Sequence, residues 1–114
     1  EALEIWGDGR AVRDYIYAPE AAKGMALGAI YRGAERVFNV GSGVGRNVLE
    51  IAGDILRVTD REELPMVHKD ARPTDVPVNV LDISKIHREF DWAPITPWSQ
   101  ALRETADWVR GICS

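Results

Sequence analysis

The stretch Val37-Phe38-Asn39-Val40-Gly41-Ser42-Gly43-Val44-Gly45-Arg46-Asn47-Val48 decides the fold class of this 114-residue chain. The apolar run at 36–40 predicts a strand, and the glycines after it predict a tight loop. Asn47 is a favourable helix cap. Apolar side chains then recur at helical spacing, at Val48, Ile51, Ala52, Ile55 and Leu56. A strand, a glycine loop and a helix in this order indicate an α/β protein.

The Gly41–Gly45 loop stands where a dinucleotide-binding loop would stand, between a strand and a helix. Its third glycine comes one position too early for the G-x-G-x-x-G pattern, because Arg46 occupies the required place. The spacing therefore favours a strand-to-helix turn beside some other ligand. It leaves open a role in binding the pyrophosphate of a cofactor.

The N-terminal segments add strands and a helix. Leu3–Trp6 and the β-branched and aromatic run at 12–17 predict two strands, and the Gly7-Asp8-Gly9 turn between them predicts a hairpin. Pro19 suits the first turn of a helix over 18–31. The apolar residues of that helix cover more than one narrow stripe, so we expect it to be buried over much of its surface.

The C-terminal half alternates loops and helices. A short strand is expected at 65–68, and a polar loop with two prolines follows at 70–79. Asp82 or Ser84 begins a short helix, and Thr96-Pro97 begins the last one, with Thr96 as its cap. Three tryptophans are predicted to lie in the core, at Trp92, Trp98 and Trp108.

Composition excludes several classes of partner and site. The chain has 14 basic and 18 acidic residues, a net charge of −4, and no basic block, so we expect neither nucleic acid nor a membrane surface as partner. No apolar run reaches about 18 residues. A single cysteine, Cys113, fits a reducing compartment, and we expect a cytoplasmic protein. With His68 and His87 separated by 19 positions, no metal site is expected.

The strand at 12–17 carries residues that suit an anionic ligand. Arg13 and Tyr15 point to one face of such a strand, and Asp14 points to the other. The guanidinium suits a phosphate, and the phenol suits a base or a sugar. The alternative is a cross-strand ion pair for Arg13 and a half-buried Tyr15.

The loop Arg72-Pro73-Thr74-Asp75 carries a second such combination. Arg72 can bind a phosphate through two parallel hydrogen bonds, and the carboxylate of Asp75 can accept from two adjacent hydroxyls. Together they suit the junction of phosphate and ribose in a nucleotide. The alternative is a surface loop with a local ion pair between Arg72 and Asp75.

Six segments, in chain order, resemble the C-terminal third of an extended short-chain dehydrogenase/reductase, an NAD-dependent nucleotide-sugar epimerase/dehydratase of the UDP-glucose 4-epimerase-like subtype. They are Ile5-Trp6-Gly7-Asp8-Gly9, Val12-Arg13-Asp14-Tyr15-Ile16-Tyr17, Val37-Phe38-Asn39-Val40-Gly41-Ser42-Gly43, Arg72-Pro73-Thr74-Asp75-Val76-Pro77, Leu81-Asp82-Ile83-Ser84-Lys85 and Phe90-Asp91-Trp92-Ala93-Pro94. The resemblance implies the substrate-binding part of a Rossmann-type enzyme, with short strands and about four helices.

The same resemblance implies roles for five residues. The arginines matching Arg13 and Arg72 hold the substrate pyrophosphate in such epimerases, and the aspartate matching Asp75 accepts hydrogen bonds from the ribose. The tyrosine matching Tyr15 lies in the substrate cleft. The residue matching Val48 lines the nucleotide pocket.

Two features of the complete enzymes are missing from this sequence. It has no glycine-rich NAD loop and no Tyr-x-x-x-Lys pair, since none of its tyrosines has a lysine four residues later. We therefore expect residues 1–114 to be one substrate-binding segment without the N-terminal dinucleotide-binding lobe and without catalytic residues. NAD belongs to the complete family enzyme, and this chain alone is expected to bind none and to be inactive.

The leading hypothesis is thus the UDP-sugar-binding part of a nucleotide-sugar epimerase. The alternatives are a dehydratase or reductase of the same family, or a non-catalytic module that binds a nucleotide sugar or a protein. Its expected partners are the nucleotide-sugar substrate and a missing lobe or second chain. Because the helix at 18–31 and the strand at 37–40 would complete the dinucleotide lobe, we also expect an exposed apolar patch and self-association.

Overall fold

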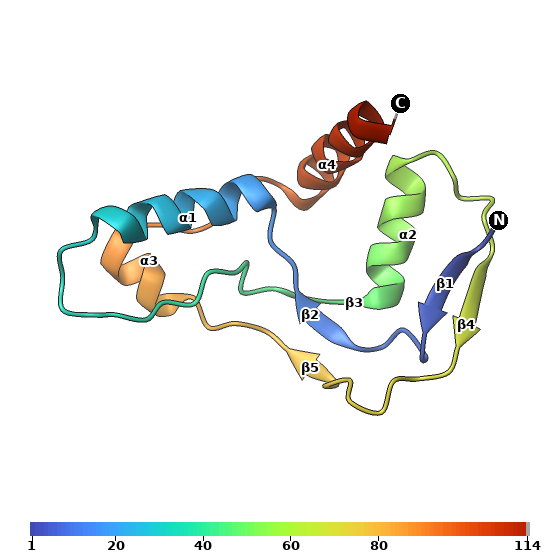
Figure 1. Cartoon of the computed structure of the whole chain (residues 1–114), viewed down its shortest axis with the longest axis horizontal. Coiled ribbons are helices and arrows are strands. Elements are labelled where there is room, and N and C mark those ends of the chain that lie inside the picture. The colour runs from blue at the N-terminus through green and yellow to red at the C-terminus, as the bar shows by residue number, and fades with distance from the viewer. Residues whose placement is uncertain (114) are drawn as a thin grey trace.

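The computed structural model describes residues 1–113 and confirms an α/β architecture (Figure 1). The elements in chain order are β1 (Leu3–Trp6), β2 (Val12–Asp14), α1 (Ala18–Ile30), β3 (Gly45–Asn47), α2 (Val48–Val58), β4 (Met66–Lys69), β5 (Val78–Asn79), α3 (Ser84–Phe90) and α4 (Trp98–Cys113). The expected number of four helices and the short strands are both found within the described range.

The strands form two small sheets rather than the predicted hairpin. β1 pairs in parallel with β4, with Leu3 opposite Met66. β2 lies between β3, which is antiparallel to it, and β5, which is parallel. The Gly7-Asp8-Gly9 turn is present, and both glycines have positive φ. However, the turn leads β2 away from β1, because both strands find their partners in distant segments. The hairpin prediction was therefore wrong.

The apolar segment at 36–40 is not a strand either. It runs as irregular backbone, and its contacts are made by side chains. The ring of Phe38 lies 4.5 Å from that of Phe90 and 5.2 Å from that of Tyr31. Asn39 donates a hydrogen bond of 3.1 Å to the carbonyl of Asp82. The apolar pattern therefore reflects an aromatic cluster with α1 and α3, and not sheet pairing.

Helix α2 begins at the predicted cap. The side chain of Asn47 accepts from the amide of Glu50, and the Glu50 carboxylate accepts from the amide of Asn47, each at 2.8 Å. This reciprocal pair satisfies two amides that a helix start otherwise leaves free. The buried face of α2 carries Ile51, Ala52 and Leu56.

Helix α1 is much less buried than its composition predicts. Its buried residues are Glu20 and Gly24, while Met25 and Ile30 are 69% and 71% exposed. The expectation of a largely buried helix was wrong for this chain, and apolar side chains of α1 are exposed, as the expected apolar patch requires. Of the tryptophans, Trp92 lies in the core, whereas Trp108 is 65% exposed at the distal half of α4.

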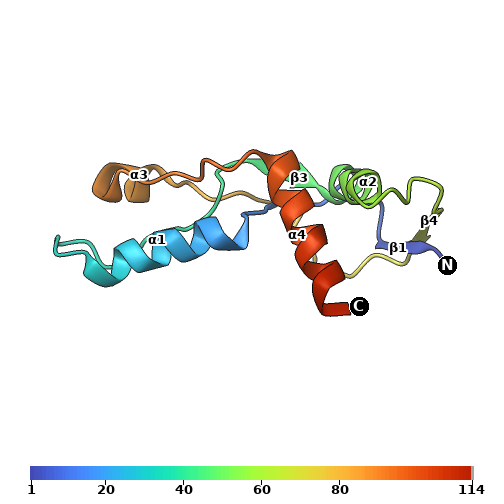
Figure 2. The same ribbon diagram turned by 90° about the horizontal axis from the view of Figure 1, so that it is seen from above.

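The molecule is flat and elongated, with principal extents of 50 × 36 × 20 Å (Figures 1 and 2). Its radius of gyration is 16.6 Å, against about 13 Å for a compact domain of this length. Its accessible surface is 8003 Å², against about 6,200 Å² for a compact protein of 12.7 kDa. None of the helices in residues 1–113 is long and apolar enough to cross a membrane. The chain thus exposes far more surface than a self-contained domain.

Candidate functional site

The carboxylate of Asp14, at the end of β2, fixes the glycine loop. Its Oδ1 accepts from the amide and the hydroxyl of Ser42, at 2.7 and 2.6 Å. Its Oδ2 accepts from the amides of Gly43 and Leu81, at 2.8 and 3.3 Å. Burial alone would raise the pKa of Asp14, but the hydrogen bonds from Ser42, Gly43 and Leu81 outweigh it and lower the pKa.

This arrangement decides between the two interpretations of the Gly41–Gly45 loop. The N–H groups of Ser42 and Gly43 already donate hydrogen bonds to Asp14, so they are not presented to a phosphate. Gly43 adopts a φ of 72°, which favours glycine for conformational reasons alone. The loop is a turn held by an internal carboxylate, and its residues do not suit the pyrophosphate of a dinucleotide.

Arg13 reaches from β2 to the loop that contains Arg72 and Asp75. Its Nη1 donates to the carbonyl of Val76 at 2.6 Å and to that of Val12 at 2.8 Å. The Nη2 and Nε donors of Arg13 carry no hydrogen bond to residues 1–113. The residue opposite Arg13 in β3 is Arg46, so the alternative of a cross-strand ion pair is not found.

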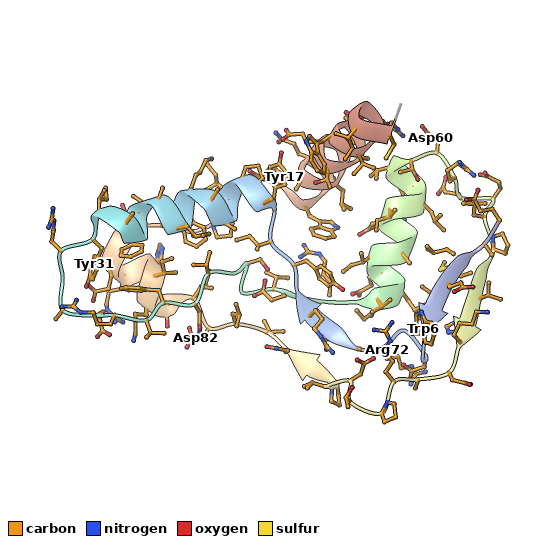
Figure 3. All side chains as sticks on the ribbon, viewed as in Figure 1. Trp6, Tyr17, Tyr31, Asp60, Arg72 and Asp82 are labelled. Carbon is orange, nitrogen blue, oxygen red and sulfur yellow. The ribbon has the colours of Figure 1, made fainter. Side chains whose placement is uncertain are left out.

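Arg72 and Asp75 are both exposed and share one turn, in which the amide of Asp75 donates to the carbonyl of Arg72 at 3.2 Å. The Arg72 guanidinium lies over the ring of Trp6, 4.9 Å from its centroid (both labelled in Figure 3). Within residues 1–113 the two side chains form no ion pair with each other, so the purely local alternative is not supported.

Tyr15 and Val48 contact other parts of the chain than the 72–76 loop: Tyr15 shares a cavity with Arg46 of β3, and Val48 begins α2. Tyr15 is half-buried and lines a cavity of about 150 Å³ together with Arg46 and Trp98. Val48, also half-buried, is the first residue of α2. The predicted site residues therefore form two groups. Arg13 joins the 72–76 loop, and Tyr15 faces the cavity beside Arg46.

A cluster around Trp98 was not predicted from the sequence. The Arg46 guanidinium lies 4.0 Å from the centroid of the Trp98 ring. The indole Nε1 donates to Asp54 at 2.8 Å, and the other oxygen of Asp54 accepts from Arg57, also at 2.8 Å. The bond from Trp98, aided by Arg57, lowers the pKa of Asp54 despite partial burial. An arginine next to a glycine loop was the one available signal.

Glu20 is a second carboxylate that sequence reasoning missed. It is 1% exposed and accepts from the amides of Thr96 and Ile95, at 2.9 and 3.3 Å, and from the Thr96 hydroxyl. The hydroxyl bond is the main reason that the pKa of Glu20 is lowered, against the effect of burial. Glu20 thereby attaches the first turn of α1 to the segment that precedes α4.

Residues 1–105 match the sequence profile of the GDP-mannose 4,6 dehydratase family. The chain belongs to this family. It is thus a member of the extended short-chain dehydrogenases/reductases that act as NAD-dependent nucleotide-sugar epimerases, dehydratases and reductases, as the order of its motifs predicted.

Curated relatives carry several of these activities. A dTDP-4-dehydro-6-deoxy-D-allose reductase from a Streptomyces species is 31% identical over 96% of this chain and 33% of its own length. UDP-glucose 4-epimerase 1 of rice, Oryza sativa subsp. japonica, is 29% identical over 95% of this chain and 34% of its own length. The chain therefore spans about a third of the length of these relatives.

Solved structures show the same relationship. The UDP-glucose 4-epimerase of Thermotoga maritima with UDP-glucose has a TM-score of 0.90 and 31% identity, and it covers all of this chain and 36% of its own. A UDP-N-acetylglucosamine 4-epimerase of Methanobrevibacter ruminantium, in complex with UDP-N-acetylmuramic acid, has a TM-score of 0.88, 29% identity, and covers 98% and 36%. The UDP-glucose 4-epimerase of Thermus thermophilus, complexed with NAD, has a TM-score of 0.85, 26% identity, and covers 96% and 36%.

Proposed function

We propose that this chain is the UDP-sugar-binding part of an NAD-dependent nucleotide-sugar epimerase. The observation that carries the proposal is the bond from the Arg13 guanidinium to the carbonyl of Val76. It ties β2 to the loop of Arg72 and Asp75, so the two arginines come from segments that are in direct contact. This contact between the segments supports a diphosphate site that both arginines share.

The chemistry of the five residues supports the same ligand. A diphosphate carries a charge near −2 and is neutralised by two guanidiniums, each of which can donate parallel hydrogen bonds. Within residues 1–113 the Asp75 side chain has no ion-pair partner, so its carboxylate is available to the ribose hydroxyls. Val48 supplies an apolar wall for the nucleoside. Tyr15 faces the sugar from the cavity beside Arg46. In this proposal no residue of the chain performs the chemical step.

The excess surface supports a second lobe that carries the cofactor. The chain exposes about 1,800 Å² more than a compact protein of its mass, which is about twice the roughly 800 Å² that one partner buries in a standard protein interface. The exposed apolar residues of α1 supply part of that area, namely Met25 and Ile30. Because the glycine loop is occupied by Asp14, NAD and the acid/base pair are assigned to the second lobe.

Titration with UDP, followed by NMR of the 15N-labelled chain, tests the proposal. Arg72→Ala should weaken UDP binding at least about tenfold, because a charge-assisted hydrogen bond contributes roughly 1.5–3 kcal/mol. Arg61→Ala is the matched control. Arg61 is also exposed and pairs with Glu63, and both residues precede β4 in the chain, whereas the loop of Arg72 follows it. Equal affinities of the wild type and Arg72→Ala, or no UDP binding at millimolar concentration, would contradict the assignment.

A reductase or dehydratase of nucleotide sugars is the second candidate. The match to the GDP-mannose 4,6 dehydratase family favours a dehydratase, and the Streptomyces relative at 31% identity favours a reductase. The three activities share the substrate-binding residues proposed here. Product analysis of the complete enzyme with UDP-glucose separates them, since an epimerase returns a UDP-hexose and a dehydratase releases water.

A further inference from the structure

We propose that Arg46, Tyr15 and Trp98 form a subsite for a carboxylate on the sugar, so that the preferred substrates are UDP-uronic acids. This inference rests on the UDP-sugar site proposed above and extends it from the diphosphate to the sugar. It is based on the strand register, on the charge that remains at Arg46, and on the cavity that the three side chains line.

The register places Arg46 beside the proposed diphosphate site. Arg46 in β3 lies directly opposite Arg13 in β2. Side chains of such a pair leave the same face of the sheet, with their Cβ atoms about 5 Å apart. Two like charges at this spacing are unfavourable unless an anion or another partner compensates them. A sugar attached to a diphosphate at Arg13 would begin next to Arg46.

Arg46 forms no direct ion pair within residues 1–113, although its charge contributes to the lowered pKa of Asp54. Its guanidinium lies over Trp98, which holds it in place, but within residues 1–113 no ion pair joins it to a carboxylate. Both oxygens of Asp54, the carboxylate of this cluster, accept hydrogen bonds, one from Trp98 and one from Arg57. Arg13 and Arg72 already balance a diphosphate, so Arg46 is a third and surplus cation.

The cavity has the chemistry of a site for an acidic sugar. It measures about 150 Å³, and Tyr15, Trp98 and Arg46 are among the residues that line it. Aromatic faces suit the C–H face of a pyranose, and a guanidinium binds a carboxylate through two parallel hydrogen bonds. Glu20 also lines the cavity, but its carboxylate is bound by Thr96 and Ile95. The ligand carboxylate is therefore assigned to the Arg46 side.

Paired NMR titrations with UDP-glucuronate and UDP-glucose test this subsite. The wild-type chain should bind UDP-glucuronate about tenfold more tightly, since the two ligands differ by one carboxylate that forms charge-assisted hydrogen bonds. Arg46→Leu should abolish this difference, because it should weaken the binding of UDP-glucuronate much more than that of UDP-glucose. The indole Nε1–H signal of Trp98 should shift with UDP-glucuronate in the wild type. Arg103→Leu, which removes an exposed arginine of α4 outside this cavity, should change neither affinity.

The outcomes separate this inference from the function on which it rests. Equal affinities of the wild type for the two ligands would overturn the subsite and leave the UDP site intact. Equal weakening of both ligands by Arg46→Leu would also overturn it, because Arg46 would then contact the diphosphate. Failure to bind either ligand would overturn the proposed function itself. If the amide NMR signals of Arg46→Leu lose their chemical-shift dispersion, which would indicate unfolding, Arg46→Gln provides the same comparison with a polar side chain.

Discussion

Replacing Asp14 with asparagine should lower the stability of the chain by about 2–4 kcal/mol. The Asn Oδ1 can keep the two bonds from Ser42, but the new amide group faces the N–H groups of Gly43 and Leu81. Two bonds are lost and two donors are left without an acceptor, each at a cost of about 1–3 kcal/mol, with the lower values expected because Asp14 is partly exposed.

Urea unfolding followed by far-UV circular dichroism measures this loss. Asp60→Asn is the matched control, because Asp60 is exposed, has a φ of 55° that asparagine also tolerates, and should change stability by less than about 0.5 kcal/mol. Hydrogen exchange of the Ser42 and Gly43 amides gives a second, local readout, and both amides should lose protection. If Asp14→Asn unfolds at the same urea concentration as Asp60→Asn, the role given to the Asp14 carboxylate is refuted.

Two further predictions concern pH and association. The pKa values of Asp14, Glu20 and Asp54 are lowered in the folded chain. Their contribution to stability should therefore be complete above about pH 4.5 and be lost as pH falls through the folded pKa values. Urea midpoints at pH 7, 5 and 3 test this, and an unchanged midpoint at pH 3 would disprove it. The exposed apolar face of α1 should drive self-association, so sedimentation should find oligomers of the wild type that Met25→Lys and Ile30→Lys together dissociate, and a monomeric wild type would contradict this.

The sequence was most informative where the physical cause is local. Asn47 and Glu50 lie three residues apart, and the capping box they form depends on nothing outside that turn. The same holds for Pro19 in the first turn of α1. Sheet pairing depends on segments far apart in the chain, so the hairpin prediction failed, and the strand at 36–40 turned out to be a packing site for Phe38.

The candidate site shows the same division. The predicted strand at 12–17 ends at Asp14, so alternation along it does not place Tyr15, and it could not name Ser42, Gly43 and Leu81 as the partners of Asp14. The sequence shows Arg46 after the glycine loop but does not show that it lies opposite Arg13, because the register of β2 against β3 sets that pairing. The buried state of Glu20 could not be anticipated, since its partners lie 75 and 76 residues later in the chain.

The strand order has a consequence for synthesis on the ribosome. β1 pairs with residues 66–69, and the sheet of β2 is complete only once residues 78–79 pair with it. Neither sheet can close until residues 66–79 have left the exit tunnel, so β1 and β2 emerge with unpaired edges and the apolar α1 uncovered. A nascent chain of this topology is an expected client of chaperones that hold hydrophobic segments until residues 66–79 have been synthesised.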